Sequence, residues 1–330
     1  MKALVYTGIE SLNYQTVTDP NPKPGEVLVR VESVGICGSD MHAFLGHDER
    51  RPAPLILGHE AAGIVQGGPR DGERVTVNPL VSCGICPACQ SGRDNLCAAR
   101  QIISLPPREG AFAQWLAIPE TNLVTIPDGV GFDKAALAEP IACGWHAAGE
   151  ARRLLREQAG PVRALVLGGG AIGLGAALCL AAQGINDVTI IEPNPLRRDF
   201  LILTCKQNTM APEDLTAGQM FDLVIDAVGF AATRKTASAH TRPGGVIAHI
   251  GLGEGTGGLD IRRMTLQEII FIGTYTYTAE DFRDTAAAIF DGRLGALDWT
   301  ESRPLADGQT AFADIRAGKT ASPKIILKPN

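Results

Sequence analysis

The stretch RALVLGGGAIGLGAALCLAAQGINDVTIIEP, residues 163–193, decides the fold of this 330-residue chain. It opens with an apolar run, Arg163 to Leu167, continues through three consecutive glycines, and is then apolar through Ala181. A second apolar run, DVTIIEP, occupies residues 187–193. Strand, helix and strand in succession form a right-handed βαβ unit with parallel strands. We therefore expect an α/β fold with a doubly wound parallel sheet.

The same alternation of apolar strands and helical segments continues downstream. The segments are a helix from Pro195, FDLVIDAVG at 221–229, a helix at 231–240, GGVIAHIGL at 244–252 and EIIFIGTYT at 268–276. Serial βαβ units of this kind indicate a Rossmann domain. We assign residues 143–276 to it.

The remainder of the chain has a different texture. Short β-like runs broken by Gly and Pro fill the first 140 residues, among them KALVY, EVLVRVESVGIC, AAGIVQGG, ERVTVNPLV and AQWLAIPETNLVTIP. This pattern predicts an irregular β-rich domain with long loops. After a helix at 280–291 the chain ends with KIILKP, an apolar run with no sheet of its own to join. We therefore expect residues 1–142 and 277–330 to form one β-rich domain.

Composition limits the partners. The chain has 45% hydrophobic and 20% charged residues and a net charge of −6, with no Lys/Arg run. Neither nucleic acid nor an anionic membrane is therefore an expected partner. The first ten residues lack the long apolar core of a signal peptide, so we expect a cytoplasmic protein. The segment 164–182 has nineteen uncharged residues, but its five glycines favour a strand, a turn and a buried helix over a membrane span.

Four cysteines lie within fifteen residues: Cys83, Cys86, Cys89 and Cys97. Four thiolates at these spacings can surround one tetrahedral Zn²⁺ and leave no open position, which is typical of a structural site. An iron–sulfur cluster and a pair of disulfides are the alternatives. Disulfides are disfavoured in a reducing compartment, so the lobe 83–97 is predicted to bind zinc.

A second set of metal-ligand residues is dispersed. Cys37 lies in GICGSDMH, His59 and Glu60 lie in LGHEAAG, and Glu139 lies at the expected domain junction. A single Cys or His is more often a packed core residue than a ligand. Together, one Cys, one His and one or two carboxylates indicate an open zinc site in which water or a substrate oxygen takes the remaining position.

The glycines of the opening stretch predict a dinucleotide site. Gly168, Gly170 and Gly173 form G-x-G-x-x-G between a strand and a helix, which allows a tight turn and the approach of a pyrophosphate to the helix N-terminus. The remaining residues that we assign to cofactor binding are Ala171, Ile172, Glu192, Arg197, Val228 and Gly251.

Glu192 ends the next strand, nineteen residues after Gly173. A carboxylate there accepts hydrogen bonds from the adenosine 2′-hydroxyl and repels a 2′-phosphate, which favours NAD over NADP. Arg197 and Arg198 follow closely and can neutralise a phosphate, which is the argument for NADP.

In their order these motifs resemble the zinc-containing medium-chain dehydrogenase family, of the sorbitol and threonine dehydrogenase type. The resemblance covers essentially the whole chain. The matching pieces are GICGSDMH (35–42), GHEAAGIV (58–65), the four-cysteine lobe, GAFAQWLAIPE (110–120), AEPIAC (138–143), LVLGGGAIG (165–173), DAVG (226–229) and KIILKP. It implies a GroES-like catalytic domain beside the Rossmann domain, two zinc ions per chain and NAD.

The resemblance also implies roles for the dispersed set. Cys37, His59 and Glu60 become zinc ligands, and Glu139 becomes a ligand or a partner of the bound water. Zn²⁺ with one thiolate and one carboxylate is neutral, and a second carboxylate would blunt its ability to acidify an alcohol. We therefore expect that Glu60 and Glu139 are not both ligands throughout turnover.

Three residues near Cys37 are candidates for catalysis. Asp40 follows Cys37 by three residues and is predicted to hold the ring of His59. Ser39 is placed to hydrogen-bond the substrate hydroxyl. By similarity to alcohol dehydrogenases, His42 passes the proton to solvent; the alternative is a surface loop histidine. His47 and His146 have no motif support.

The expected activity is hydride transfer from a secondary alcohol to NAD, with the same groups serving ketone reduction. The expected substrate is a polyol. Arg50 and Arg51 could anchor a phosphorylated sugar alcohol; the alternative is that they are ordinary solvated loop arginines. A threonine-type 3-hydroxy amino acid dehydrogenase is the alternative enzyme, and a non-catalytic zinc and nucleotide-binding protein is the alternative from another class. The resemblance implies a homodimer or homotetramer.

Overall fold

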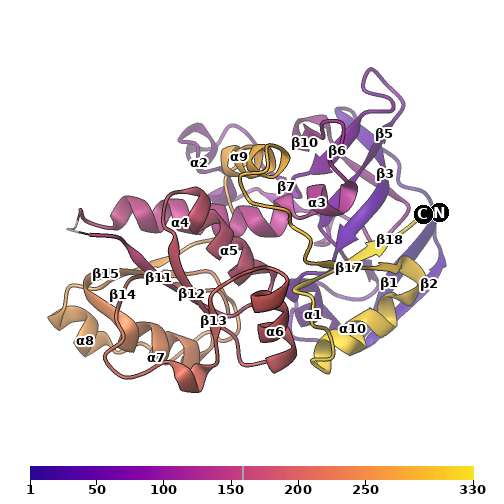
Figure 1. Ribbon diagram of the computed structural model, residues 1–330. Helices are drawn as coiled ribbons and strands as arrows, with labels where there is room; N and C mark the ends of the chain where they lie inside the picture. Colours follow the sequence, from indigo (N-terminus) through magenta and orange to yellow (C-terminus); the bar gives the residue numbers. More distant parts are fainter. Residues whose placement is uncertain (158–159) are drawn as a thin grey trace. The chain divides into compact units, whose positions relative to one another are not determined.

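The computed structural model describes residues 1–157 and 160–330, which divide into two compact units (Figure 1). The first unit comprises Met1–Glu139, Thr278–Gly292 and Trp299–Asn330. The second comprises Pro140–Tyr277 and Arg293–Asp298. The first unit is thus built from both ends of the chain, because the C-terminal segment returns to the β-rich unit.

The second unit contains a six-stranded sheet in which all neighbouring strands are parallel. Its order is β13 (Thr209–Met210), β12 (Asp187–Ile191), β11 (Arg163–Leu167), β14 (Phe221–Asp226), β15 (Thr241–His249) and β16 (Ile270–Gly273). Chain order reverses between β11 and β14, and ligands of doubly wound sheets bind beyond the strand ends at such a reversal. The predicted Rossmann sheet is therefore confirmed.

Helices accompany this sheet in the predicted places: α4 (Ala138–Leu154), α5 (Ala171–Ala182), α6 (Pro195–Leu203), α7 (Ala231–His240) and α8 (Ile261–Leu266). The apolar helix α5 is largely buried and packs closely on α4. A Cβ added to Gly144 would lie only 2.6 Å from the backbone nitrogen of Ala176. Among the residues described, no helix combines the length and the apolar character that crossing a bilayer requires.

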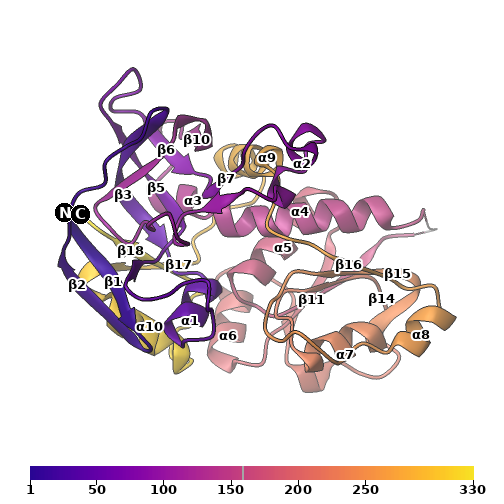
Figure 2. The same cartoon turned by 180° about the vertical axis from the view of Figure 1, so that it is seen from behind.

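The first unit contains a seven-stranded sheet, seen from behind in Figure 2. Its order is β10 (Leu123–Thr125), β6 (Arg74–Val77), β5 (Glu60–Gln66), β3 (Glu26–Gly35), β18 (Lys324–Lys328) and β17 (Thr300–Pro304), and β9 (Trp115–Pro119) also pairs with β3. The C-terminal run KIILK therefore joins the β-rich unit, as predicted, by pairing antiparallel with β3.

Smaller elements complete this unit. The remaining strands are β1 (Lys2–Gly8), β2 (Ser11–Thr16), β4 (Leu55–Ile56), β7 (Leu80–Val81) and β8 (Gln101–Ile102). The helices are α1 (Gly38–Phe44), α2 (Pro87–Gln90), α3 (Phe132–Ala136), α9 (Ala279–Phe290) and α10 (Gly308–Arg316).

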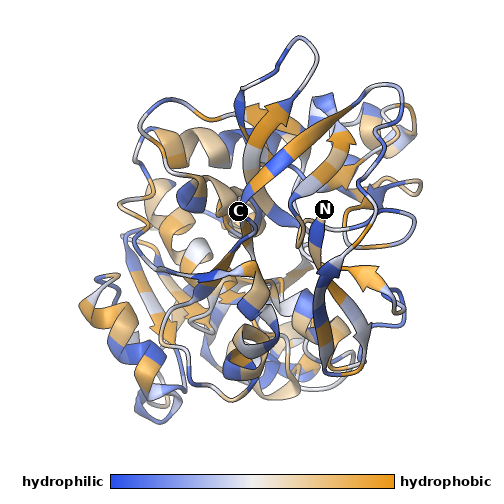
Figure 3. Ribbon diagram, turned by 90° about the vertical axis from the view of Figure 1, so that its right-hand side faces the viewer, coloured by the Kyte–Doolittle hydropathy of each residue, from blue (hydrophilic) through white to orange (hydrophobic). Residues whose placement is uncertain are grey.

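Apolar side chains of the strands form the cores, and strands carry much of the hydrophobic colour in Figure 3. In the first unit three phenylalanine rings pack together, and one of them, Phe44, is the last residue of α1. The ring of Phe312 lies 5.1 Å from that of Phe44 and 6.0 Å from that of Phe112, centroid to centroid. These distances are in the range of favourable aromatic pairs, so the rings anchor α1 to the core.

Candidate metal and cofactor sites

The first candidate metal site lies where β3 ends and β5 begins. Antiparallel pairing places Gly35, the last residue of β3, opposite Glu60, the first residue of β5. The chain segments just beyond this pair carry Cys37 and His59. The ligand atoms of Cys37, His59 and Glu60 all lie within 4.8 Å of one another. The sheet register therefore brings together three of the four predicted ligands.

Two glycines of the site motifs are required by the backbone. A Cβ on Gly35 would lie 1.9 Å from Oε2 of Glu60, so only glycine leaves room for that carboxylate. Gly58 has φ +89°, and a Cβ there would lie 2.4 Å from the ring of Phe112. Glycine adopts positive φ without the penalty that a side chain brings. Steric constraints therefore require the glycines of both the GICGSDMH and the GHEAAGIV motif.

The imidazole of His59 has polar neighbours on both nitrogens. Nδ1 lies 3.3 Å from the hydroxyl of Ser104 and 3.5 Å from Oδ1 of Asp40, and Nε2 lies 3.4 Å from the hydroxyl of Ser39. A metal-binding histidine commonly uses one nitrogen for the metal and the other for a carboxylate or carbonyl. This arrangement suits Nε2 as the ligand atom, on the side of Ser39.

Asp40 connects the two ligand segments. Its carboxylate accepts the backbone N–H of Cys37 at 3.0 Å and that of Gly58 at 3.2 Å. Burial raises the pKa of Asp40, but the charges of His59 and Arg51 and the hydrogen bonds outweigh burial and leave the pKa below its ordinary value. A buried, ionised Asp40 therefore favours positive charge at the site.

Lys324 is a part of this site that the sequence analysis missed. Its Nζ donates to both carboxylate oxygens of Glu60, at 2.6 and 2.7 Å, and to the backbone carbonyl of Ile36 at 2.8 Å. Burial lowers the pKa of Lys324, but the charges of Glu60, Cys37 and Glu139 outweigh burial and leave the pKa above its ordinary value. The one available signal was a lysine at the start of a buried strand.

Two predicted residues stand apart from the trio. Glu139, in the first turn of α4, is buried, and its charge helps to raise the pKa of Lys324. It is not among the residues whose ligand atoms lie within 4.8 Å of one another. His42 lies half-buried in α1, and its ring centroid is 6.4 Å from that of the exposed His47. The structure thus places His47, to which the sequence gave no role, beside His42.

Arg51 does not match the expectation of a phosphate anchor. Its side chain is 4% exposed, its Nε donates to the backbone carbonyl of Ser104 at 2.9 Å, and its Nη1 donates to Asp48 at 2.5 Å. Arg50, 62% exposed, donates to the same carboxylate at 2.8 Å. Arg51 therefore supports the loop beside His59, and its burial leaves no face for a substrate phosphate.

The second candidate metal site is the cysteine lobe around α2. The Sγ–Sγ distances are 3.5 Å for Cys86 and Cys89, 3.5 Å for Cys83 and Cys97, and 4.0 Å for Cys83 and Cys89. A tetrahedron with zinc–sulfur bonds of about 2.3 Å has edges of about 3.8 Å, so one zinc ion fits. A disulfide would need about 2.05 Å, so these sulfur atoms are too far apart to be bonded in pairs.

Backbone donors prepare this lobe for a metal. The N–H groups of Ile85 and Cys86 lower the pKa of Cys83 to about 6. Burial and the neighbouring Cys86 raise the pKa of Cys89 to about 11. Cys83 therefore ionises readily, whereas Cys89 beside it resists ionisation. A bound cation would favour the thiolate form of both.

The glycine motif lies between β11 and α5 and provides a close-packed turn. Gly168 has φ +97°, and a Cβ there would lie 2.4 Å from a methyl group of Val228. A Cβ on Gly173 would lie 1.8 Å from the carbonyl oxygen of Gly168, and one on Gly251 would lie 2.1 Å from the backbone of Val228. Gly170 caps α5, whose first residues are Ala171 and Ile172. The structure therefore brings these predicted cofactor residues to one edge of the sheet.

Glu192 adjoins the same turn. Its Oε2 accepts the N–H of Gly169 at 2.9 Å and its Oε1 accepts the N–H of Asn194 at 2.8 Å. The guanidinium of Arg197 lies 4.0 Å from where a Cβ on Gly170 would be. Each carboxylate oxygen has a second lone pair, so Glu192 can accept hydrogen bonds from hydroxyl groups while it also accepts those of the glycine turn.

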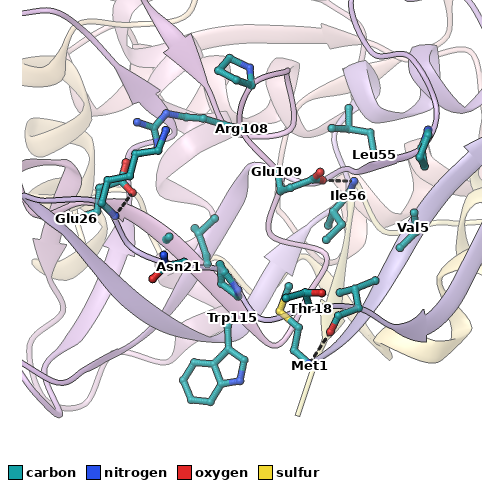
Figure 4. A pocket seen from close by; sticks show the side chains of 18 of the residues that line it. Met1, Val5, Thr18, Asn21, Glu26, Leu55, Ile56, Arg108, Glu109 and Trp115 are labelled. Atoms are coloured by element: carbon teal, nitrogen blue, oxygen red, sulfur yellow. Dashed lines mark hydrogen bonds and ion pairs between the residues drawn. The ribbon is translucent and has the colours of Figure 1, made fainter.

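A separate cavity of about 550 Å³ lies in the first unit beside β1 and β9 (Figure 4). Three of its charged side chains have partners in the wall: Arg108 pairs with Glu26 at 2.9 Å, and Glu109 accepts the N–H of Ile56 at 2.7 Å. Its walls contain none of the candidate ligands. It is therefore a different place from the metal site.

Comparison with known proteins agrees with this geometry. Residues 23–128 match the family model of the alcohol dehydrogenase GroES-like domain, and residues 171–291 match that of the zinc-binding dehydrogenases. L-galactonate-5-dehydrogenase of Escherichia coli (strain K12) is 32% identical, over 90% of this chain and 89% of that protein. The chain belongs to the zinc-containing medium-chain dehydrogenases. Sorbitol dehydrogenase of Bacillus subtilis (strain 168) is also a relative. It is 34% identical to the present chain, over 76% of this chain and 75% of that protein.

Solved structures of the family have the same fold. Acetophenone reductase from Geotrichum candidum, solved with NAD, has a TM-score of 0.87 to this dehydrogenase, with 26% identity over 99% and 96% of the two chains. Zinc and a nicotinamide adenine dinucleotide are therefore the cofactors of this medium-chain dehydrogenase, in agreement with the two ligand sets and the glycine turn.

Proposed function

We propose that this dehydrogenase oxidises a secondary alcohol of a polyol or other vicinal diol and passes the hydride to NAD⁺. The observation that carries the proposal is the convergence of Cys37, His59 and Glu60 beside the hydroxyl of Ser39. This donor set fits zinc, because it offers one thiolate, one imidazole and one carboxylate. Glu139 is proposed as an alternative partner of the metal or of its water.

The remaining residues have proposed roles in moving the proton. Bound at this site, zinc supplies Lewis acidity, and NAD⁺ supplies the hydride acceptor. Ser39 accepts the proton of the substrate hydroxyl, and His42 passes it toward solvent. Asp40 and Ser104 orient the imidazole of His59. A nearby buried carboxylate and ammonium make the site polar, which suits a substrate with neighbouring hydroxyl groups.

Several relatives support this substrate class by their names. L-galactonate-5-dehydrogenase and sorbitol dehydrogenase act on the compounds that they are named after, and D-xylulose reductase A of Neosartorya fischeri is 27% identical over 96% of this chain. A site that hydrogen-bonds substrate hydroxyls rejects analogues that lack them by large factors, so we expect strong discrimination.

The test is reduction of NAD⁺ with sorbitol, xylitol, galactitol, a sugar-alcohol phosphate, threonine, 2-propanol and ethanol measured side by side. A polyol with the highest kcat/KM supports the proposal. Ethanol or 2-propanol in first place contradicts the polyol assignment, and threonine in first place would make the protein a 3-hydroxy amino acid dehydrogenase. No reduction with any alcohol or ketone partner would indicate a non-catalytic zinc and nucleotide-binding protein.

We also propose the organisation in which the enzyme works. The GroES-like catalytic domain, with bounds of 1–142 and 277–330 predicted from the sequence, holds the structural zinc on Cys83, Cys86, Cys89 and Cys97, and residues 143–276 bind NAD. Within these bounds, Arg293–Asp298 belong to the second compact unit instead. A cytoplasmic location is proposed, because a reducing compartment keeps the four cysteines of the lobe available as zinc ligands. A homodimer or homotetramer is proposed, and light scattering coupled to size exclusion measures its mass.

A further inference from the structure

Three strand ends meet at Glu60. The central strand, β3, ends at Gly35 and lies between β5, which begins with Glu60, and β18, which begins with Lys324. A side chain at position 35 would collide with the carboxylate, since its Cβ would lie 1.9 Å from Oε2 of Glu60. The missing side chain of Gly35 therefore opens the path along which Lys324 reaches across β3 to Glu60.

The ammonium of Lys324 is fully used. An ammonium has three N–H donors, and Nζ has three acceptors: the two carboxylate oxygens of Glu60 and the backbone carbonyl of Ile36. The side chain of Lys324 is 3% exposed and that of Glu60 is 0% exposed. Water does not compete for this pair, so the carboxylate is held in one place.

The ion pair of Lys324 and Glu60 affects the net charge of the metal site. The charge of Asp40 is offset by that of Arg51. Of the remaining groups, the thiolate of Cys37 and the carboxylates of Glu60 and Glu139 carry three negative charges, and zinc carries two positive ones. Lys324 supplies the third positive charge, and the charges of all three of these residues act on it. Buried charge that is not balanced is costly, and a surplus negative charge would weaken the Lewis acidity of the metal.

We propose that Lys324 is a positioning residue of the catalytic zinc site: it shares the oxygens of Glu60 with the metal and balances the charge that Glu60 adds. Without Lys324, Glu60 would bind the metal with its full charge. The inference rests on the proposed function only for the identity of the metal.

A purely structural role is the competing interpretation, since Lys324 also joins β18 to β5. The same strand contains a matched control. Lys328, four residues further along β18, pairs with Asp133 and donates to the hydroxyl of Ser33 at 2.8 Å. This second lysine–carboxylate pair joins β18 to its neighbours without contacting any candidate ligand.

The experiment measures the metal rather than turnover. Zinc-loaded wild type, Lys324→Met, Lys324→Arg and Lys328→Met are mixed with a chromogenic chelator, and the rate of zinc release is followed. We expect Lys324→Met to release the catalytic zinc about tenfold more slowly, because the site gains net negative charge. We expect Lys324→Arg to remain within about threefold of wild type because it keeps the charge, and Lys328→Met to match wild type.

A second readout reports the ligand directly. With Co²⁺ in place of the catalytic zinc, Lys324→Met should change the visible absorption bands, because Glu60 changes its share in the coordination. If Lys324→Met folds poorly, the double variant Lys324→Met/Glu60→Gln removes both charges and is compared with Glu60→Gln alone. The proposal expects those two proteins to have the same spectrum, because neither has a carboxylate at position 60 for Lys324 to share with the metal. It expects Glu60→Gln to release zinc faster than the double variant, because only Glu60→Gln retains the charge of Lys324.

Two outcomes overturn the proposal. One is an unchanged release rate and spectrum in Lys324→Met. The other is an equal change in Lys328→Met, which would make Lys324 a structural link only. Neither measurement uses a substrate, so a protein that oxidises no alcohol would refute the proposed function and leave this inference to be decided by its own data.

Discussion

The guanidinium of Arg51 holds the backbone carbonyl of Ser104, at 2.9 Å, and the hydroxyl of Ser104 in turn lies 3.3 Å from Nδ1 of His59. Ser104 is fully buried and has φ +65°, a conformation that costs a non-glycine residue free energy. Arg51 and Ser104 are 53 residues apart in the chain. The buried side chain of Arg51 therefore keeps Ser104, the neighbour of His59, in place.

Arg51→Met is expected to lower the free energy of unfolding by about 2–4 kcal/mol, because Asp48 and the carbonyl of Ser104 lose a buried charged donor. The zinc content should also fall, since His59 loses its support. Arg50→Met is the matched control and should change stability by less than about 1 kcal/mol, because Arg50 is exposed. Urea unfolding and elemental analysis check both. A loss confined to phosphorylated substrates, with normal stability, would instead restore Arg51 as a phosphate anchor.

Two zinc ions per chain are expected, with different consequences of removal. Cys89→Ser should destabilise the protein or break its assembly, because structural zinc contributes on the order of 10 kcal/mol to folding in small sites. Cys37→Ser should abolish turnover and leave the fold intact. Elemental analysis, circular dichroism and NAD⁺ reduction separate the two. One zinc or none in carefully prepared wild type contradicts the two-site prediction.

Glu192→Ala should narrow the preference for NAD over NADP. The negative charge that repels a 2′-phosphate is lost, and the N–H of Gly169 also loses its acceptor, so NAD binds more weakly. Fluorescence titration with NADH and NADPH, together with kcat/KM for both oxidised cofactors, measures the change. Wild-type enzyme that already prefers NADP would show the assignment of Glu192 to be wrong.

His42→Ala should slow alcohol oxidation most below neutral pH, where external base is scarce, and imidazole buffers should partly restore the rate. His47→Ala is the matched control, because its exposed ring lies only 6.4 Å from that of His42. The measurement is the pH profile of kcat with and without imidazole. If the profile of His42→Ala superimposes on that of wild type, His42 is a surface histidine without a role in proton transfer.

The sequence was informative wherever chemistry depends on local spacing. The βαβ pattern at 163–193 and the cysteines at 83–97 each lie within one short segment, so period and spacing were enough to predict a Rossmann sheet and a closed thiolate site. Glu192 was recognised by its distance from Gly173. Its hydrogen bonds to the backbone were not, because they depend on how the turn after β11 folds.

Features that depend on tertiary packing were out of reach. Lys324 is 264 residues from Glu60 in the chain, and no local pattern connects them. The sequence offered a phosphate anchor or a solvated loop residue for Arg51, and neither describes its buried side chain. Adjacent arginines in a loop look alike until packing buries one and leaves the other exposed. The need for glycine at position 35 likewise follows from the register of β3 and β5.

The position of β18 has a consequence for biosynthesis. This strand lies between β3 and β17, and it is translated after every strand of the parallel sheet. All strands of the parallel sheet are translated earlier, so the nucleotide-binding unit can fold while synthesis continues. The β-rich unit keeps an open edge on β3 until β18 has been translated. Zinc that enters before then meets Glu60 without its ammonium partner, so the metal centre is completed only after β18 has joined the sheet.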